Sequence, residues 1–230
     1  AYRRQRQMCI RDRSQIEFHT LAYGKKTVLI SHSMGGTVAL YFLKWVERKR
    51  GSSWIDEHLE AFVNLSGTLL GVPKAMPALM TGEMRDTVQA PAMLAYLLER
   101  FFSAQERAEL FRSWAGSASL IPKGGNAVWG DEHGAPDDLA NATKTHGIMM
   151  EYAERHSHGN ETRPSRKLSV DEVYPWLRMH SDKHFQKMLH SNYSFGIERD
   201  PAQIQANNAD PTKWTNPLEV ALPYAPNMKI

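Results

Sequence analysis

The segment from Thr27 to Gly51 constrains the fold of this chain more than any other. It opens with Thr27-Val28-Leu29-Ile30, a short β-branched and apolar run that is typical of a strand buried on both faces. Apolar residues then recur at helical spacing, at Met34, Val38, Tyr41, Phe42, Trp45 and Val46. They predict a largely buried helix that ends near Gly51, after three cations that suit the negative end of the helix dipole. The sequence therefore predicts a strand, a tight turn and a buried helix.

A second strand follows this helix closely. Ser53 and Asp56 have the spacing of a capping box and predict a short helix, and Ala61 to Ser66 then reads as another buried strand. Because a strand, a helix and a strand in succession form a parallel pair with a right-handed crossover, we expect an α/β fold. At the other end of the chain, Pro226 to Ile230 looks like a strand that has only begun.

The middle of the chain is predicted to be mainly helical. We expect helices at 92–102, at 104–114 behind the capping box of Ser103 and Glu106, at 148–156, and after Ser169, whose capping box uses Glu172 and whose apolar pattern continues to Met188. Residues 115–147 are rich in Gly, Asp, Asn and Pro and predict a long loop, which is usually functional or disordered. We interpret about 77–200 as an insertion on the sheet.

Composition and charge narrow the class of protein. With 42% hydrophobic and 23% charged residues the chain lies in the globular range, and no window approaches the apolar length of a membrane span. The net charge of +3 comes from residues 1–13, which carry +4 and leave −1 for 14–230. This arm lacks interleaved aromatic residues and a nucleic-acid-binding motif, so we expect no nucleic-acid partner. We treat 1–13 as a non-native or disordered tail and 14–230 as the domain.

The cysteine content excludes two kinds of site. Cys9 is the only cysteine of the chain and lies in the tail, so no internal disulfide can form and no cysteine-based metal site is present. We accordingly expect neither a metal nor a cofactor. The same count leaves the redox compartment of the protein open.

The turn between the first strand and its helix carries the motif that indicates chemistry. It is close to the nucleophile elbow G-x-S-x-G and reads Ser31-His32-Ser33-Met34-Gly35-Gly36, with Ser31 in place of the first glycine. Small residues two places before and after a nucleophilic serine let strand and helix approach. We therefore predict Ser33 as a nucleophile and the Met34 N–H as half of an oxyanion hole, supported by Ser31, His32, Gly35 and Gly36. We expect His32 to pack beside the nucleophile and not to act as its base.

The sequence assigns no base or acid to Ser33. In such a fold they follow the serine in the order Asp or Glu, then His, on loops after later strands. Asp131 with His133, and Asp182 with His184, are available pairs. No predicted strand precedes either pair, so we interpret all four as solvated polar residues.

Four triplets have the pattern of N-glycosylation acceptors, at Asn64, Asn141, Asn160 and Asn192. Asn64 lies in a predicted buried strand, and we interpret its triplet as a coincidence. The other three favour a luminal or secreted location over the cytosol, although coincidence remains an alternative.

Several ordered blocks resemble the lecithin:cholesterol acyltransferase family, and within it the branch that moves acyl groups from phospholipid to diacylglycerol. They include SHSMGG (31–36), YFLKWVE (41–47), SGTLLGVPKAMPALMTGEMRDT (66–87), LIPKG (120–124) and WTNPLEVALPYAPNMKI (214–230). The resemblance covers 14–230. It implies an α/β-hydrolase fold with a mainly helical cap, incomplete at both ends. It also implies that Ser33 is the nucleophile and that the Met34 N–H serves the oxyanion hole.

The function implied by the resemblance is a transfer through a serine acyl-enzyme. The acyl donor is a phospholipid at a membrane surface, the acceptor is diacylglycerol and the product is triacylglycerol, on the luminal side of the endoplasmic reticulum membrane. A phospholipase of the same family and a non-catalytic lipid-binding relative are the alternatives. The resemblance places the acid and His of the triad after the end of this chain and the membrane anchor before its start, so we expect this piece alone to be inactive.

Overall fold

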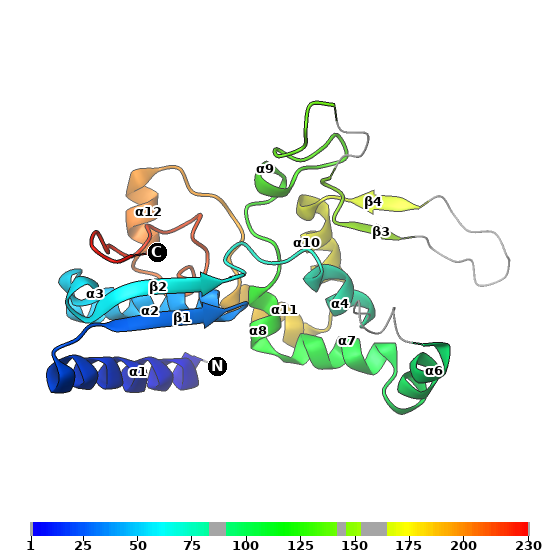
Figure 1. The fold of residues 1–230 in the computed structure, drawn as a ribbon. Coiled ribbons are helices and arrows are strands. Elements are labelled where there is room, and N and C mark those ends of the chain that lie inside the picture. The colour runs from blue at the N-terminus through cyan, green and yellow to red at the C-terminus, as the bar shows by residue number, and fades with distance from the viewer. Residues whose placement is uncertain (1, 83–90, 142–145, 153–164, 230) are drawn as a thin grey trace, which may run out of the picture. The chain divides into compact units, whose positions relative to one another are not determined.

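The computed structural model describes residues 2–82, 91–141, 146–152 and 165–229 (Figure 1). The chain divides into two compact units. The first consists of Ala1–Leu69 and Asn192–Ile230, and the second of Leu70–Ser191. Helices predominate in the described residues, and each unit contains one small sheet, so the mixed α/β class predicted from the sequence is confirmed.

The sheet of the first unit is the predicted parallel pair. Strands β1 (Thr27–His32) and β2 (Leu59–Leu65) pair in parallel, with Ile30 opposite Val63. Helices α2 (Gly35–Arg50) and α3 (Ser53–His58) form the connection between them. On β2, Ala61 also forms an isolated parallel bridge with Lys229, which lies in the segment where a strand is expected at 226–230.

Helix α2 forms the centre of the core of this unit. All six residues from Tyr41 to Val46 are buried, whereas Met34 and Val38 of the predicted apolar pattern are exposed. The Tyr41 ring packs on the ring of Trp214, with 5.4 Å between centroids. The helix ends where predicted, because the N–H of Gly51, at φ 95°, donates to the Glu47 carbonyl at 2.9 Å. The buried residues therefore anchor the middle of α2 in the core of this unit.

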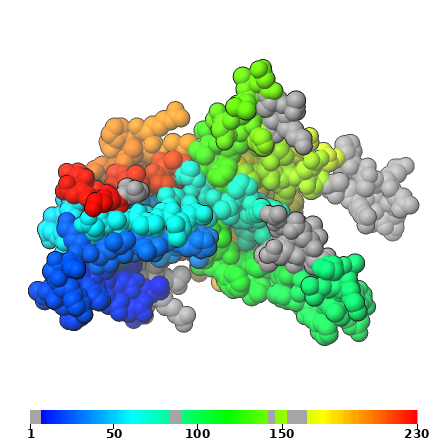
Figure 2. Space-filling view, viewed as in Figure 1, coloured from blue at the N-terminus to red at the C-terminus, as the bar shows by residue number. Residues whose placement is uncertain are grey.

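The other face of the sheet is open, which corrects the expectation of strands buried on both faces. Val28 and Ile30 are 48% and 65% exposed, and Val63 and Leu65 on β2 are exposed beside them. Figure 2 shows atoms of both strands, in blue and cyan, at the surface. Side chains alternate between faces along a strand, so only Leu29 and its neighbours on the same face lie on the α2 side. Among the residues that the structure describes, no element of this unit covers the open face.

The N-terminal residues form a helix that packs on the core of this unit. Helix α1 spans Tyr2–Tyr23, and the side chains of Cys9 and Ile16 are buried in the same core as α2. The indole N–H of Trp54 donates to the Glu17 carboxylate at 3.0 Å, which ties α1 to α3. The helix ends at Gly24, whose left-handed φ of 63° lets its N–H reach the Thr20 carbonyl at 2.9 Å. Within 7–13 the Cys9 side chain is buried, whereas Gln7, Met8, Ile10 and Arg11 are exposed. Helix α12 (Pro201–Asn207) completes the unit.

The second unit is mainly helical. Ser103 and Ser169 each form the predicted capping box, with Glu106 and Glu172 respectively, and begin α7 and α10. One antiparallel hairpin pairs β3 (Met150–Tyr152) with β4 (Arg166–Leu168). The described helices are α4 (Ala75–Thr81), α6 (Ala92–Phe101), α7 (Ala104–Ser113), α8 (Ala115–Ser119), α9 (Asn126–Trp129), α10 (Val170–Met179) and α11 (Lys183–Asn192). Among the described helices, none combines the length and the apolar character that crossing a bilayer requires.

Several local predictions were wrong. Residues 150–152 form β3 instead of the helix expected at 148–156, because they pair with β4; positions 153–156 lie outside the described residues. Short helices α8 and α9 interrupt the loop expected at 115–147. The helix expected to continue to Met188 breaks after His180, because Asp182 accepts from the Phe185 N–H and starts α11. The capping box predicted from Ser53 and Asp56 does not form, because Ser52 is the N-cap of α3 and its side chain forms no cap hydrogen bond.

Candidate functional site

Ser33 lies at the turn between β1 and α2 and has a left-handed backbone, with φ of 53°. A residue with a Cβ is strained in this region, by roughly 1–2 kcal/mol. Its main chain is held on both sides. The Ser33 N–H donates to the Leu65 carbonyl at 3.0 Å, and the Ser33 carbonyl accepts from Gly36 N–H at 3.0 Å and Thr68 N–H at 3.2 Å. The end of β2 therefore fixes the strained turn.

The two glycines of the motif differ in how much room surrounds them. A Cβ added to Gly35 would lie 3.5 Å from the Ser31 Cβ, which is an ordinary contact. At Gly36 the space is much tighter, since a Cβ there would lie 2.8 Å from Asn64 Oδ1 and 3.1 Å from the Gly67 Cα. The second glycine of the pair, not the first, is where α2 approaches its neighbours most closely.

Met34 occupies the N-cap of α2 with helical backbone angles, φ −56° and ψ −20°. The first N–H groups of a helix have no partner within it, and the positive end of the helix dipole lies there. Within the described part of the chain, the Met34 N–H has no hydrogen-bond acceptor and the Ser33 hydroxyl has no partner. A hydroxyl and a donor for a developing negative charge thus lie on consecutive residues, at the N-terminus of a helix of 16 residues.

His32 does not pack beside Ser33 as expected. It is exposed and falls on the open face of the sheet with Ile30, because alternate residues of a strand share a face. Ser31, on the opposite face, is buried and donates its hydroxyl to Asn64 Oδ1 at 3.0 Å. In the described part of the chain, His32 forms no hydrogen bond, ion pair or ring contact with the turn.

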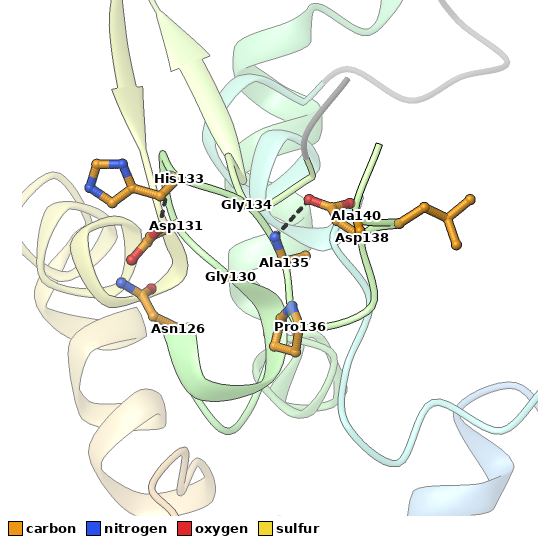
Figure 3. Close-up of a pocket in the computed structure, with 10 residues that line it drawn as sticks. Asn126, Gly130, Asp131, His133, Gly134, Ala135, Pro136, Asp138 and Ala140 are labelled. Carbon is orange, nitrogen blue, oxygen red and sulfur yellow. Dashed lines mark hydrogen bonds between the residues drawn. The ribbon is translucent and has the colours of Figure 1, made fainter. Parts of the chain in front are cut away.

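The two Asp and His pairs considered from the sequence both hold loops. In the second unit, Asp131 Oδ1 accepts the backbone N–H of His133 at 2.9 Å, and both residues line a hollow of about 500 Å³ (Figure 3). Asp182 accepts the N–H of Phe185 at 2.9 Å and lies 3.9 Å from the Arg112 guanidinium. These contacts are those of turn and helix caps, and they involve the two Asp side chains but neither imidazole ring.

A third pair, Asp138 and His146, was missed by the sequence analysis. Asp138 Oδ2 accepts the N–H groups of Ala135 at 2.8 Å and His146 at 2.9 Å, and His146 Nδ1 lies 2.5 Å from Asp138 Oδ1. The two backbone donors, and then the imidazole, lower the pKa of Asp138 to about 2. Figure 3 shows the Asp138 carboxylate directed at Ala135. A spacing of eight residues in a loop gives no sequence signal for such a contact.

Metal chemistry has no support in the described side chains. Among residues 2–82, 91–141, 146–152 and 165–229, no three His, Cys, Asp or Glu side chains gather in a way that could hold a metal ion.

The family model for lecithin:cholesterol acyltransferase matches residues 3–230. The chain belongs to the lecithin:cholesterol acyltransferase family. This family has an α/β-hydrolase-like fold, which agrees with the parallel strands and the strand-to-helix turn of the first unit.

Two relatives within this family are similar along most of the chain. A phospholipid:diacylglycerol acyltransferase of Schizosaccharomyces pombe is 43% identical over 219 residues, which are 94% of this chain and 34% of that protein. One of Saccharomyces cerevisiae is 39% identical over 226 residues, 95% of this chain and 33% of that protein. A human lysosomal phospholipase A and acyltransferase is 37% identical over 120 residues, 52% of this chain and 25% of that protein. The chain thus spans about a third of the length of the first two.

The candidate site, as far as the described residues show it, is the turn at Ser33. It provides a serine on a strained turn and an N–H at a helix start. No described side chain forms a hydrogen bond with the Ser33 hydroxyl. A base for Ser33 is therefore not assigned from the described residues.

Proposed function

We propose that the full-length protein moves a fatty acyl group from a phospholipid to diacylglycerol and forms triacylglycerol, through an ester of Ser33. The observation that carries this proposal is the left-handed Ser33, φ 53°, at the turn between β1 and α2. The choice of substrates is supported by a phospholipid:diacylglycerol acyltransferase of S. pombe, to which this chain is 43% identical over 94% of its length. A serine at a helix N-terminus suits ester exchange through a covalent intermediate.

In the first half of this reaction, Ser33 Oγ attacks the carbonyl carbon of the phospholipid ester. The Met34 N–H, at the positive end of α2, stabilises the oxyanion that develops on the carbonyl oxygen. The ester bond breaks, and the lysophospholipid oxygen receives the proton that a base has taken from Ser33. In the second half, the diacylglycerol hydroxyl attacks the Ser33 ester, and Ser33 regains its proton as triacylglycerol leaves.

Hydrolysis by the same residues is the second candidate function. It is favoured by the 37% identity, over 120 residues, to a human protein named lysosomal phospholipase A and acyltransferase. Water and diacylglycerol compete for one acyl-enzyme, so the outcome depends on how well the acceptor site excludes water.

The full-length protein tests both functions with a phospholipid that carries a labelled acyl chain, with and without diacylglycerol. We expect labelled triacylglycerol to exceed labelled free fatty acid when diacylglycerol is present. Ser33→Ala should abolish both products, whereas Ser53→Ala, at an exposed serine of the same unit, should leave them unchanged. Free fatty acid as the main product in both arms would establish the phospholipase. A fluorophosphonate probe that fails to modify Ser33 would indicate a non-catalytic relative.

The second unit, which overlaps the expected insertion at 77–200, is proposed to be the cap and to bring the enzyme to a membrane surface. Support for the second role comes from α6, a helix of 10 residues with no buried side chain. Five of its apolar side chains are exposed: Met93, Leu94, Tyr96, Leu97 and Phe101. Apolar surface of this kind is typical of lipid or protein contacts, and the proposed substrates are membrane lipids.

The catalytic domain is proposed to lie on the luminal side of the endoplasmic reticulum membrane. The triplets at Asn141, Asn160 and Asn192 support this location, and Asn141 is exposed. Endoglycosidase H should increase the mobility of the full-length protein in gel electrophoresis, and Asn141→Gln should remove one step of that shift. An unglycosylated protein would contradict the luminal location.

A further inference from the structure

The side chain of Asn64 lies next to the turn that carries Ser33. Asn64 is on β2, opposite Ser31 on β1, and both side chains fall on the face of the sheet that α2 covers. The Ser31 hydroxyl donates to Asn64 Oδ1 at 3.0 Å. Ser31 is buried and Asn64 is half-buried, so this hydrogen bond is partly shielded from water.

Two glycines leave room for the Asn64 carboxamide. A Cβ added to Gly67 would lie 2.0 Å from Asn64 Oδ1, and a Cβ added to Gly36 would lie 2.8 Å from the same atom. Real Cβ atoms do not approach so closely, so neither position accepts a side chain while the carboxamide stays in place. Asn64 therefore fills the space between the first turn of α2 and the chain that leaves β2.

The same segment of β2 holds the backbone of the nucleophile. Leu65 accepts from the Ser33 N–H at 3.0 Å, and Thr68 donates its N–H to the Ser33 carbonyl at 3.2 Å. Thr37, on α2, donates its hydroxyl to the Thr68 carbonyl at 3.2 Å. A residue strained at φ 53° keeps that conformation only where its surroundings fix it from several sides. Asn64 is the side chain that connects these surroundings with Ser31.

We propose that Asn64 is a positioning residue for acylation of Ser33, because its carboxamide joins Ser31, two residues before the nucleophile, to the α2 and β2 ends that fix the turn. This role rests on the proposed function of Ser33. Asn64 does not touch the reacting atoms; it restricts the backbone from which the hydroxyl projects. A shift of about 1 Å in a reacting group can lower a rate about a hundredfold, so loss of this restraint should reduce the rate of acylation far more than binding.

The test uses the full-length protein and a fluorophosphonate probe, and measures the rate constant of inactivation, kinact, and the probe concentration for half-maximal rate, KI. We expect Asn64→Ala to lower kinact about 10- to 100-fold and to change KI less than about twofold. Ser31→Ala removes the same hydrogen bond without removing the carboxamide, and should lower kinact in the same direction. Since the two side chains act as one unit, the double variant should lose less than the product of the two single effects.

Asn207→Ala is the matched control for a merely structural effect. Asn207 is buried in the same unit and donates its amide to the Glu219 carbonyl at 2.9 Å, away from the turn at Ser33. It should lower the melting temperature and leave kinact of the folded protein unchanged. Equal losses of kinact in Asn64→Ala and Asn207→Ala, or an unchanged kinact in both Asn64→Ala and Ser31→Ala, would overturn the role of Asn64 alone. Failure of the probe to modify Ser33 in the unsubstituted protein would overturn the proposed function and this role together.

Discussion

Ser33 and Ser66 follow neighbouring parallel strands with the same left-handed backbone, at φ 53° and φ 50°. They are the two non-glycine residues with positive φ in the described part of the chain. Ser33 follows β1 and Ser66 follows β2, so the two chains turn away from the sheet at the same edge. Ser66 lies between Leu65 and Thr68, whose main chains form hydrogen bonds with Ser33. The two strained turns are therefore linked.

Replacement of either serine by glycine should stabilise the protein. Ser33→Gly and Ser66→Gly should each raise the free energy of unfolding by about 0.5–1 kcal/mol, because glycine relieves the left-handed strain. The gain is smaller than the strain itself, because glycine also increases the conformational entropy of the unfolded chain. Ser33→Ala retains the strain and should give no gain. Chemical denaturation of the full-length protein measures these differences. Equal free energies of unfolding for Ser33→Gly and Ser33→Ala would show that Ser33 is not strained. As a control, the Ser66→Gly protein should still be labelled by a fluorophosphonate probe.

The strand, turn and helix at 27–51 were predictable because all of their signals are local. The β-branched run, the apolar spacing and Gly51 act within one element each, and the structure agrees with them. The capping boxes at Ser103 and Ser169 are equally local and were also predicted correctly. The sequence therefore indicated the Ser33 turn as a candidate site. It gave no signal for the role of Asn64, because the hydrogen bond between Ser31 and Asn64 joins positions that are 33 residues apart in the chain.

The remaining differences come from contacts between distant segments. The sequence of an apolar strand does not show whether one or both of its faces are covered. The exposure of Ile30 could therefore not be predicted from the sequence. Residues 150–152 became a strand because of pairing with residues 166–168. The pair of Asp138 and His146 likewise depends on the path of the loop and not on a local motif.

The acid dependence of the second unit should reflect Asp138. The pKa of its carboxyl is about 2 in the folded protein, against 3.8 for the unperturbed group, so the charged form is favoured by folding. Its stabilising contribution is complete above about pH 4 and is lost as the pH falls through 2. The difference in melting temperature between the unsubstituted protein and Asp138→Asn should therefore narrow as the pH is lowered from about 5 to about 2. A difference in melting temperature that stays constant over this range would show that folding does not lower the pKa of Asp138.

Cys9 should report on the N-terminal helix. Its thiol is 5% exposed, and burial, followed by the charge of Asp12, raises its pKa to about 11. The thiolate is the reactive form, so a maleimide should modify Cys9 in the native protein far more slowly than in denaturant. We expect slow labelling at pH 7 and complete labelling in urea. Labelling at equal rates in both conditions would show that residues 7–13 form the disordered tail expected from the sequence.

Contact between α6 and a lipid surface should appear in the substrate dependence of the reaction. The triple replacement Met93→Ser, Leu94→Ser and Phe101→Ser removes three exposed apolar side chains from a helix that has no buried residue, so it should disturb folding little. Each such side chain gains roughly 1.5–3 kcal/mol when it is fully buried. Transfer from phospholipid in vesicles should therefore fall about tenfold or more, while transfer from a water-soluble short-chain phospholipid stays the same. Met179→Ser, at an exposed apolar residue of α10, is the control and should affect neither rate. Equal losses on both substrates would place the effect of α6 in the fold or the acyl site and not at the membrane.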